Sequence, residues 1–133
     1  MVDTAINNLL AFLSFFTVAI AILTVFLTAY ALITPYNELV LIRQGNVAAA
    51  VSLGGALLGI ALPVAVAVGV SHNLLSMVGW GVLACVIQLC VFVACRVILP
   101  HIAEDIPEGK LASGIFLASL SIGVGIINAG CLV

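Results

Sequence analysis

The stretch that decides the fold is Gln44–Cys95, QGNVAAAVSLGGALLGIALPVAVAVGVSHNLLSMVGWGVLACVIQLCVFVAC, in which no Asp, Glu, Lys or Arg occurs over 52 residues. A single membrane-spanning helix needs about 20 apolar residues to cross roughly 30 Å of hydrocarbon. The stretch is therefore long enough for two spans, and its one polar cluster, Gly69–Asn73, marks the turn between them. We expect a membrane hairpin at the centre of the chain.

The composition extends this interpretation to the whole chain. Hydrophobic residues make up 65% and charged residues 6% of the sequence, a balance that excludes a soluble globular domain. The apolar runs are continuous rather than alternating, which excludes a β-barrel. We predict an all-α, polytopic membrane protein that forms one four-helix domain over residues 1–133, with the lipid bilayer as its partner and no nucleic acid. The expected spans are residues 5–33, 47–69, 73–99 and 110–132.

The first span carries its few polar residues on one face. At helical spacing this stripe consists of Ser14, Thr17, Ala21, Thr24 and Thr28. Small hydroxylated residues on a membrane helix usually mark packing against another helix, with each hydroxyl bonded back to its own backbone. The alternative is a water-lined path through Thr17 and Thr24, and we favour packing.

A short polar segment follows the first span. Thr34 and Pro35 end the helix, because proline disfavours the α conformation of the residue before it. Residues 35–44, with Glu38 among apolar neighbours, are typical of a short helix at the membrane interface. Gly45 then supplies a C-terminal stop and Asn46 a cap for the next helix.

The second span carries small residues on one face: Ala48, Ser52, Gly55, Gly59 and Pro63. Gly55 and Gly59 form a GxxxG pair, which allows a neighbouring helix to approach to backbone contact. Pro63 has no N–H for the carbonyl of Gly59 and should kink the helix. That carbonyl is then satisfied by a nearby hydroxyl, which we favour, or serves as a ligand for an ion or water.

The third and fourth spans contain the remaining polar groups at membrane depth. Gln88 lies near the middle of the third span, where an unpaired amide is unfavourable. Counting about 1.5 Å per residue places Ser119 and Ser121 at a depth that permits a hydrogen bond with Gln88, whereas Asn128 lies too far out.

The fourth span is small on two opposite faces, and a helix that is small on both sides is expected to pack on both. One face consists of Ala112, Ser119, Gly123 and Gly130, and the other of Gly114, Ala118, Ser121, Gly125 and Asn128.

The two halves of the chain correspond to each other. Each half reads as a span, a proline, a short amphipathic loop, a glycine and a small-residue span, over about residues 5–70 and 73–132. The register pairs Gly45 with Gly109, Gly55 with Ser119 and Gly59 with Gly123. Because each unit holds two spans, the tandem repeats should share one orientation about an axis along the membrane normal.

Three segments resemble a known family. They are Thr34–Pro35 with Glu38, Gly45–Asn46 followed by Ala48–Ala50, and Asn128–Ala129 with Cys131. In these segments, and over nearly its whole length, the chain is similar to the YjfL-like family of small bacterial inner-membrane proteins, a domain of unknown function. The resemblance implies a cytoplasmic-membrane location and four spans, and it brings a looser association with envelope stress systems and so with other envelope proteins.

The sequence offers no residues for catalysis. Cys85, Cys90 and Cys95 turn by about 140° at each step and cannot converge on one metal. No hydrolase, nucleotide-binding or zinc-protease motif is present, so we expect no enzyme activity, cofactor or metal. The favoured function is a homo-oligomeric membrane scaffold packed through Gly55, Gly59, Gly123 and Gly125. The alternative is a passive pore lined by Thr17, Thr24, Gln88, Ser121 or Asn128.

The positive charges predict the topology. Arg43, Arg96 and Lys110 all lie at the loop ends of the spans on one side, and they are the only Lys and Arg residues in the chain. The positive-inside rule then puts both charged loops in the cytoplasm and both termini in the periplasm.

Overall fold

Four long apolar helices and two short ones make up the chain. The computed structural model describes residues 1–133, and its helices are α1 (Val2–Ile33), α2 (Glu38–Arg43), α3 (Val47–Val70), α4 (Leu74–Ile98), α5 (Ile102–Asp105) and α6 (Leu111–Leu132). The long helices α1, α3, α4 and α6 each have the length and hydropathy of a membrane span. The predicted all-helical class with four spans is confirmed.

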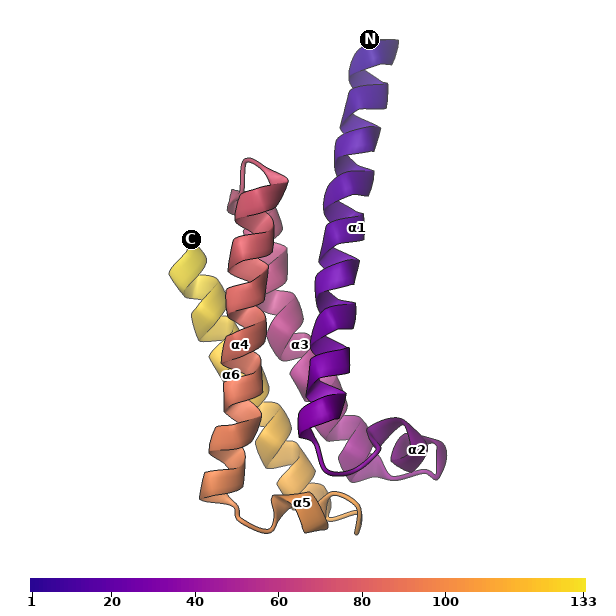
Figure 1. The fold of residues 1–133 in the computed structure, drawn as a ribbon, viewed down its shortest axis with the longest axis vertical. Helices are drawn as coiled ribbons and strands as arrows, with labels where there is room; N and C mark the ends of the chain where they lie inside the picture. Colours follow the sequence, from indigo (N-terminus) through magenta and orange to yellow (C-terminus); the bar gives the residue numbers. More distant parts are fainter.

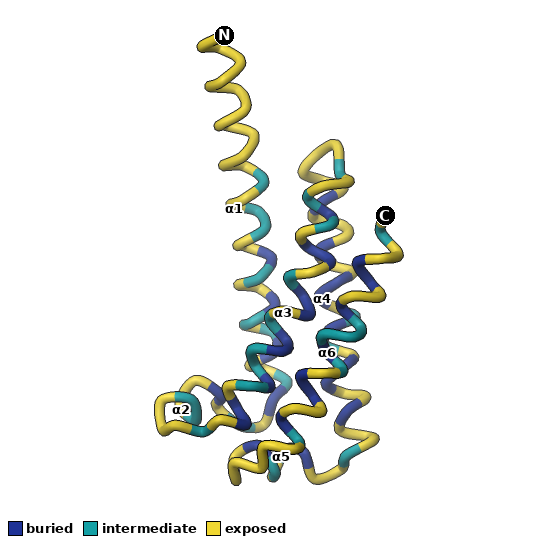
Figure 2. Tube along the Cα trace, turned by 180° about the vertical axis from the view of Figure 1, so that it is seen from behind, coloured by how far each residue is buried: buried dark blue, intermediate teal, exposed yellow.

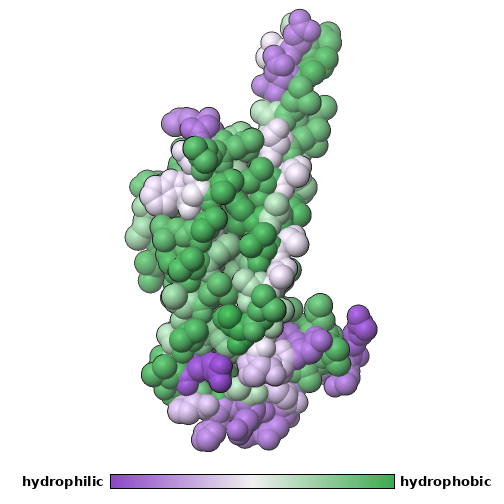
Figure 3. Space-filling model, viewed as in Figure 1, coloured by the Kyte–Doolittle hydropathy of each residue, from purple (hydrophilic) through white to green (hydrophobic).

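The four long helices alternate in direction. From the N-terminus, α1 runs toward the end of the molecule that carries α2 and α5, α3 returns, α4 runs down again and α6 returns (Figure 1). Both termini and the turn between α3 and α4 therefore point the same way, opposite to α2 and α5. Figure 3 shows a largely apolar surface between polar groups at the two ends.

Side-chain caps and two glycines define where the spans begin. Asn46 accepts a hydrogen bond from the N–H of Ala49 at 3.0 Å, and Asn73 accepts one from the N–H of Ser76 at 2.8 Å. Gly45 and Gly109 have φ of 85° and 79°, a left-handed conformation that glycine adopts without steric penalty. In each half of the chain, the glycine reverses the backbone just before a span starts.

The α3–α6 contact is the closest in the molecule, because small residues face each other. A Cβ added at Gly55 would overlap Ala118, one added at Gly125 would overlap the carbonyl of Gly59, and one at Gly114 would lie 2.7 Å from the carbonyl oxygen of Ala48. Residue numbers rise together along the two helices at this contact, so α3 and α6 run parallel and side by side. Figure 2 shows buried positions along both helices, and those of α3 are shared between this seam and the core formed with α1 and α4.

Helix α1 is held by its C-terminal half. Ile22, Phe26 and Tyr30, spaced four residues apart, are its buried side chains, and the Tyr30 ring packs edge-on against Phe92 of α4 at a centroid distance of 5.5 Å. All of residues 1–14 are exposed, and this part of α1 extends well past the α3–α4 turn (Figures 1 and 2).

A single asparagine joins the two connecting segments. The Asn46 amide nitrogen donates to the carbonyl of Ile106 at 2.8 Å and to that of Pro107 at 3.2 Å. The start of α3 is thereby tied to the segment that follows α5, sixty residues later in the chain.

Candidate functional site

One buried side chain links three of the spans. The amide nitrogen of Gln88 in α4 donates to the carbonyl of Gly59 in α3 and to the carbonyl of Ser121 in α6, each at 3.1 Å. Gly59 is the residue whose carbonyl Pro63 leaves without a helical donor, because proline has no N–H. The carbonyl is thus satisfied by a side chain of a neighbouring helix rather than by a hydroxyl.

The polar residues of α6 differ in whether they are buried between helices or exposed. Ser121 is buried and meets Gln88 through its backbone carbonyl, whereas Ser119 is exposed on the opposite face of α6. Asn128 is also buried on the α3 side, and its amide nitrogen has no hydrogen-bond partner in the protein, nor has the side-chain oxygen of Gln88. Among the two serines, the orientation of α6 places only Ser121 against Gln88.

The predicted packing glycines also fall into two groups. Gly55, Gly59 and Gly125 lie in the α3–α6 seam, where no Cβ fits without a shift of backbone. Gly123 and Gly130 lie on the other face of α6, and a Cβ at either would meet nothing within 4 Å. The small face of α6 that contacts α3 is therefore the one that bears Gly125, and the face that bears Gly123 is open.

The hydroxyl stripe of α1 does not pack within the chain. Ser14, Thr24 and Thr28 donate to carbonyls four residues earlier, at 2.9 to 3.0 Å, as expected for hydroxyls bonded to their own helix. The same residues and Thr17 are nevertheless exposed. The helix instead packs through its aliphatic and aromatic face, whose large side chains make van der Waals contacts with the neighbouring helices.

A cavity opens where α1 ends and α2 begins. It has a volume of about 570 Å³ and lies between the C-terminal half of α1, the Thr34–Asn37 segment, α2 and α3. Eleven residues line it, most of them hydrophobic: Leu27, Tyr30, Ala31, Thr34, Pro35, Tyr36, Asn37, Glu38, Leu39, Leu53 and Leu57.

Three polar side chains at this cavity lack hydrogen-bond partners. They are the hydroxyls of Tyr30 and Tyr36 and both carboxyl oxygens of Glu38, which is only 7% exposed. Burial raises the pKa of Glu38 from 4.5 to about 8. Burial, together with the nearby Glu38 carboxylate, also raises the pKa of Tyr36.

Three of the family-motif residues, Thr34, Pro35 and Glu38, line this cavity, whereas Asn128, Ala129 and Cys131 lie at the far end of α6. The Thr34 hydroxyl bonds to the carbonyls of Ala31 and Tyr36 at 3.3 and 3.4 Å, and Pro35 follows it in the cavity wall. Tyr30 and Tyr36 are site residues that the sequence patterns did not predict. The available signal was the presence of two tyrosines and a glutamate within nine residues at a span boundary.

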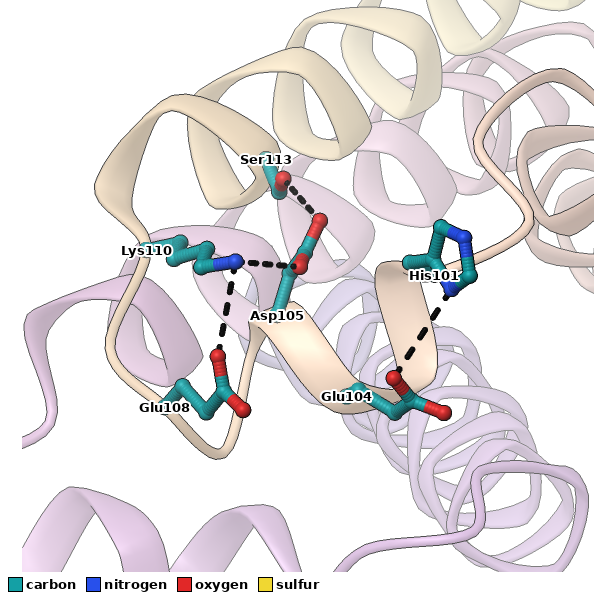
Figure 4. Close-up of polar contacts among 6 residues, drawn as sticks. All are labelled: His101, Glu104, Asp105, Glu108, Lys110 and Ser113. Carbon is teal, nitrogen blue, oxygen red and sulfur yellow. Dashed lines mark hydrogen bonds and ion pairs between the residues drawn. The ribbon is translucent and has the colours of Figure 1, made fainter.

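The second charged segment forms a network at the surface. The Ser113 hydroxyl donates to Asp105 at 2.9 Å, and Lys110 pairs with Asp105 at 3.2 Å and with Glu108 at 3.4 Å (Figure 4). The Ser113 hydrogen bond and Lys110 lower the pKa of Asp105. No group of three or more His, Cys, Asp and Glu side chains lies close enough together to hold a metal ion.

Comparisons with known proteins give one consistent family. The family model described as Domain of Unknown Function (DUF350) matches residues 4–132. The UPF0719 inner membrane protein YjfL of Escherichia coli K12 is 36% identical over 127 residues, covering 96% of both chains. The UPF0719 transmembrane protein YshE of Bacillus subtilis is 31% identical over 125 residues, covering 92% of this chain and 93% of that one. No solved structure matches the chain.

Proposed function

Because the chain belongs to the DUF350 family of multi-pass inner-membrane proteins, whose function is unknown, we propose from its own geometry that it is a non-enzymatic scaffold that assembles with copies of itself. The observation that carries the proposal is the open small-residue face of α6, formed by Ala112, Ser119, Gly123 and Gly130. Like the face that α6 uses against α3, it presents small residues along the helix, here with the exposed Phe116 beside them. Small faces of this kind let membrane helices approach closely.

The internal repeat indicates what covers the open face. In the register that pairs Gly55 with Ser119, the open face of α6 corresponds to the face of α3 that packs on α6. The counterpart of the inner α6 face is a second stripe on α3, consisting of Ala50, Gly54, Leu57, Ala61 and Val64. Leu57 and Val64 are its larger members, Val64 is already buried within the chain, and a Cβ at Gly54 would meet nothing within 4 Å.

A second copy can therefore repeat the internal contact. The open face of α6 from one copy would lie on the second stripe of α3 from the next, as α3 lies on α6 within the chain. Such a head-to-tail contact joins two different faces, so it closes into a ring or continues as a row. The parallel course of α3 and α6 supports tandem repeats of equal orientation.

The distribution of polar side chains supports the scaffold over the pore. Gln88, Ser121 and Asn128 are buried between helices, while Thr17 and Thr24 face outward from α1. These residues do not share a surface, so they cannot line one channel together. A pore lined by the α1 hydroxyls alone would require several copies around a wet axis.

The orientation and partners complete the proposal. Arg43, Arg96 and Lys110 lie at the α2 and α5 end, so that end faces the cytoplasm and both termini face the periplasm. Association with other envelope proteins rests on the family resemblance alone.

Leucine substitutions on the open faces test the assembly. Gly123→Leu in α6 and Gly54→Leu in α3 should give smaller particles in native mass spectrometry from nanodiscs, with helical content unchanged. Gly79→Leu in α4 is the matched control, because Gly79 is exposed and a Cβ there also meets nothing within 4 Å. Wild-type protein that stays monomeric over a range of protein-to-lipid ratios would overturn the proposal.

Cross-linking tests the head-to-tail geometry. The repeat register places Ser119 of one copy against Gly54 of the next, as Gly55 lies against Ala118 within the chain. In a background without native cysteines, Ser119→Cys and Gly54→Cys should cross-link when the two variants are mixed, and neither should cross-link alone. Cross-links formed by either variant alone would indicate a symmetric dimer instead.

A further inference from the structure

Glu38 is a buried acid for which the protein supplies no partner. Its side chain lies at the wall of the α1–α2–α3 cavity, it is 7% exposed, and neither carboxyl oxygen accepts a hydrogen bond or joins an ion pair. A buried carboxylate without donors is destabilising, whereas one that faces a cation and N–H donors is satisfied. We therefore expect a hydrogen-bond donor from outside the chain at this position.

The polar groups nearest to Glu38 are two phenol hydroxyls, and the one cation close to them, Arg96 beside Tyr36, pairs with no carboxylate. The Tyr30 and Tyr36 hydroxyls also lack partners, and the rings of Phe26 and Phe92 hold the Tyr30 ring at centroid distances of 5.6 and 5.5 Å. Cys95 of α4 lies near both phenols and Arg96 lies near Tyr36, and Arg96 is exposed and forms no ion pair. The residues of the cavity wall thus carry, just beneath its surface, two phenol oxygens and one carboxyl group, which supplies a negative charge once it loses its proton.

The remaining cavity walls indicate the polarity and size of the rest of the ligand. Leu27, Leu53 and Leu57 give the cavity an apolar side, and its volume of about 570 Å³ is far larger than a bare ion and within the range of small-molecule sites, about 300–1,000 Å³. A ligand that matches all of these surfaces carries one positive nitrogen with N–H donors and a hydrocarbon portion.

We propose that this cavity binds an organic ammonium ion, with the ammonium group at Glu38 and the two tyrosine hydroxyls and the hydrocarbon portion against the three leucines. The ionised carboxylate supplies the counter-charge, and the phenol oxygens accept the remaining N–H groups. Because the cavity lies where α1 ends, at the level expected for lipid headgroups, the ammonium can come from an ethanolamine lipid or from a free amine.

Binding of a soluble probe tests the site. Phenethylamine, a protonated primary amine with an aromatic body, should bind the purified full-length protein at pH 8, as measured by isothermal titration calorimetry. Its uncharged analogue 2-phenylethanol should bind at least about tenfold more weakly, since it lacks the charge that pairs with Glu38. Equal affinity for the two compounds would overturn the proposal, because the cavity would then recognise only the apolar body.

Matched variants tie the binding to Glu38. Glu38→Gln keeps the shape and removes the charge, and it should weaken phenethylamine binding at least about tenfold. Glu104→Gln is the control, because Glu104 is an exposed carboxylate on the other charged segment. Tyr36→Phe removes a hydroxyl that has no partner in the protein, so it should fold normally and bind the amine more weakly. Unchanged binding by both Glu38→Gln and Tyr36→Phe would refute the site.

A lipid arm separates the two sources. The protein is released from nanodiscs that contain phosphatidylethanolamine and phosphatidylglycerol, and bound lipids are counted by native mass spectrometry. Selective loss of phosphatidylethanolamine in Glu38→Gln, with phosphatidylglycerol and the Glu104→Gln control unchanged, identifies a lipid headgroup as the source. Equal lipid retention in all variants, together with phenethylamine binding that depends on Glu38, identifies a free amine. If neither phenethylamine binding nor phosphatidylethanolamine retention depends on Glu38, the proposal fails.

Discussion

Gln88 donates a hydrogen bond of 3.1 Å to the carbonyl of Gly59, the one carbonyl of α3 that Pro63 deprives of its helical partner. The two irregularities compensate each other: a proline opens the hydrogen-bond ladder of one span, and an amide from another span closes it. In hydrocarbon, where no solvent can take over, such compensation is required of every backbone group. The same amide reaches Ser121, so the pair also positions α6.

Replacement of Gln88 should therefore destabilise the fold. Gln88→Leu leaves the Gly59 carbonyl without a donor, and we expect a loss of about 1–2 kcal/mol in thermal or denaturant unfolding followed by circular dichroism. Gln44→Leu, at an exposed glutamine beyond α2, is the control and should have little effect. Gln88→Leu with wild-type stability would contradict this role.

A double-mutant cycle tests the compensation itself. Pro63→Ala restores an N–H for the Gly59 carbonyl, so it should be less harmful, or favourable, when Gln88 is already leucine. We expect the two changes to couple by at least about 0.5 kcal/mol. Additive effects would mean that Pro63 and Gln88 act independently.

Two glycines of α3, Gly59 and Gly54, should respond differently to one added methyl group. A Cβ at Gly59 would lie 2.8 Å from the side-chain oxygen of Gln88 and would overlap the Ser121 carbonyl, whereas one at Gly54 meets nothing. Gly59→Ala should lower stability by about 1–3 kcal/mol through overpacking, and Gly54→Ala should be neutral or slightly stabilising. The comparison is made by unfolding in one detergent, and equal losses would contradict the α3–α6 contact.

The buried acid should make stability depend on pH. The folded protein retains a proton on Glu38 up to about pH 8, whereas the unfolded chain releases it near 4.5. Between these values the folded state binds more protons, so stability should fall as pH rises through this window. Wild-type melting temperatures measured in amine-free detergent should decline from pH 5 to pH 8. Glu38→Gln should remove most of this slope, and an equal slope in both proteins would contradict the burial of an unpaired acid.

The orientation of the chain can be measured directly. A C-terminal fusion should show periplasmic alkaline phosphatase activity and no cytoplasmic green fluorescence, because all three Lys and Arg residues lie at the opposite end. Fluorescence without phosphatase activity would show the opposite topology, with the C-terminus in the cytoplasm. Adding positive charge to the α3–α4 turn, for example by His72→Arg with Asn73→Arg, should weaken the preference for this orientation and lower the phosphatase activity of the fusion.

Sequence alone predicted the parts of the fold that depend on composition and spacing. The absence of charge over Gln44–Cys95 located the hairpin, and its turn lies at Ser71–Asn73 as expected. The small-residue period of α3 identified the helix face that contacts α6. These features are local, because a span is recognised by its length and a close contact by the glycines that permit it.

Other features depend on which face of each helix the fold buries, and the local sequence does not determine this. The sequence predicts that the hydroxyl stripe of α1 packs, and within the chain it faces outward instead, because the larger side chains of Ile22, Phe26 and Tyr30 make the van der Waals contacts with the neighbouring helices. A depth count could not separate Ser119 from Ser121, which lie on opposite sides of one helix. The burial of Glu38 follows from how α2 folds against α1 and α3, and no periodicity within residues 35–44 encodes it.

The unequal lengths of the spans have a mechanical consequence for the lipid around the protein. At about 1.5 Å per residue, the apolar part of α1, from Leu9 to Ile33, is 25 residues or roughly 38 Å long, whereas the 22 residues of α6 extend roughly 33 Å. The bilayer beside α1 must therefore thicken, or α1 must tilt, while the bilayer beside α6 stays near its ordinary thickness. Each copy therefore imposes a gradient of thickness on the membrane. Neighbouring copies that share one thickened region deform less lipid in total, which favours clustering independently of any direct contact between their helices.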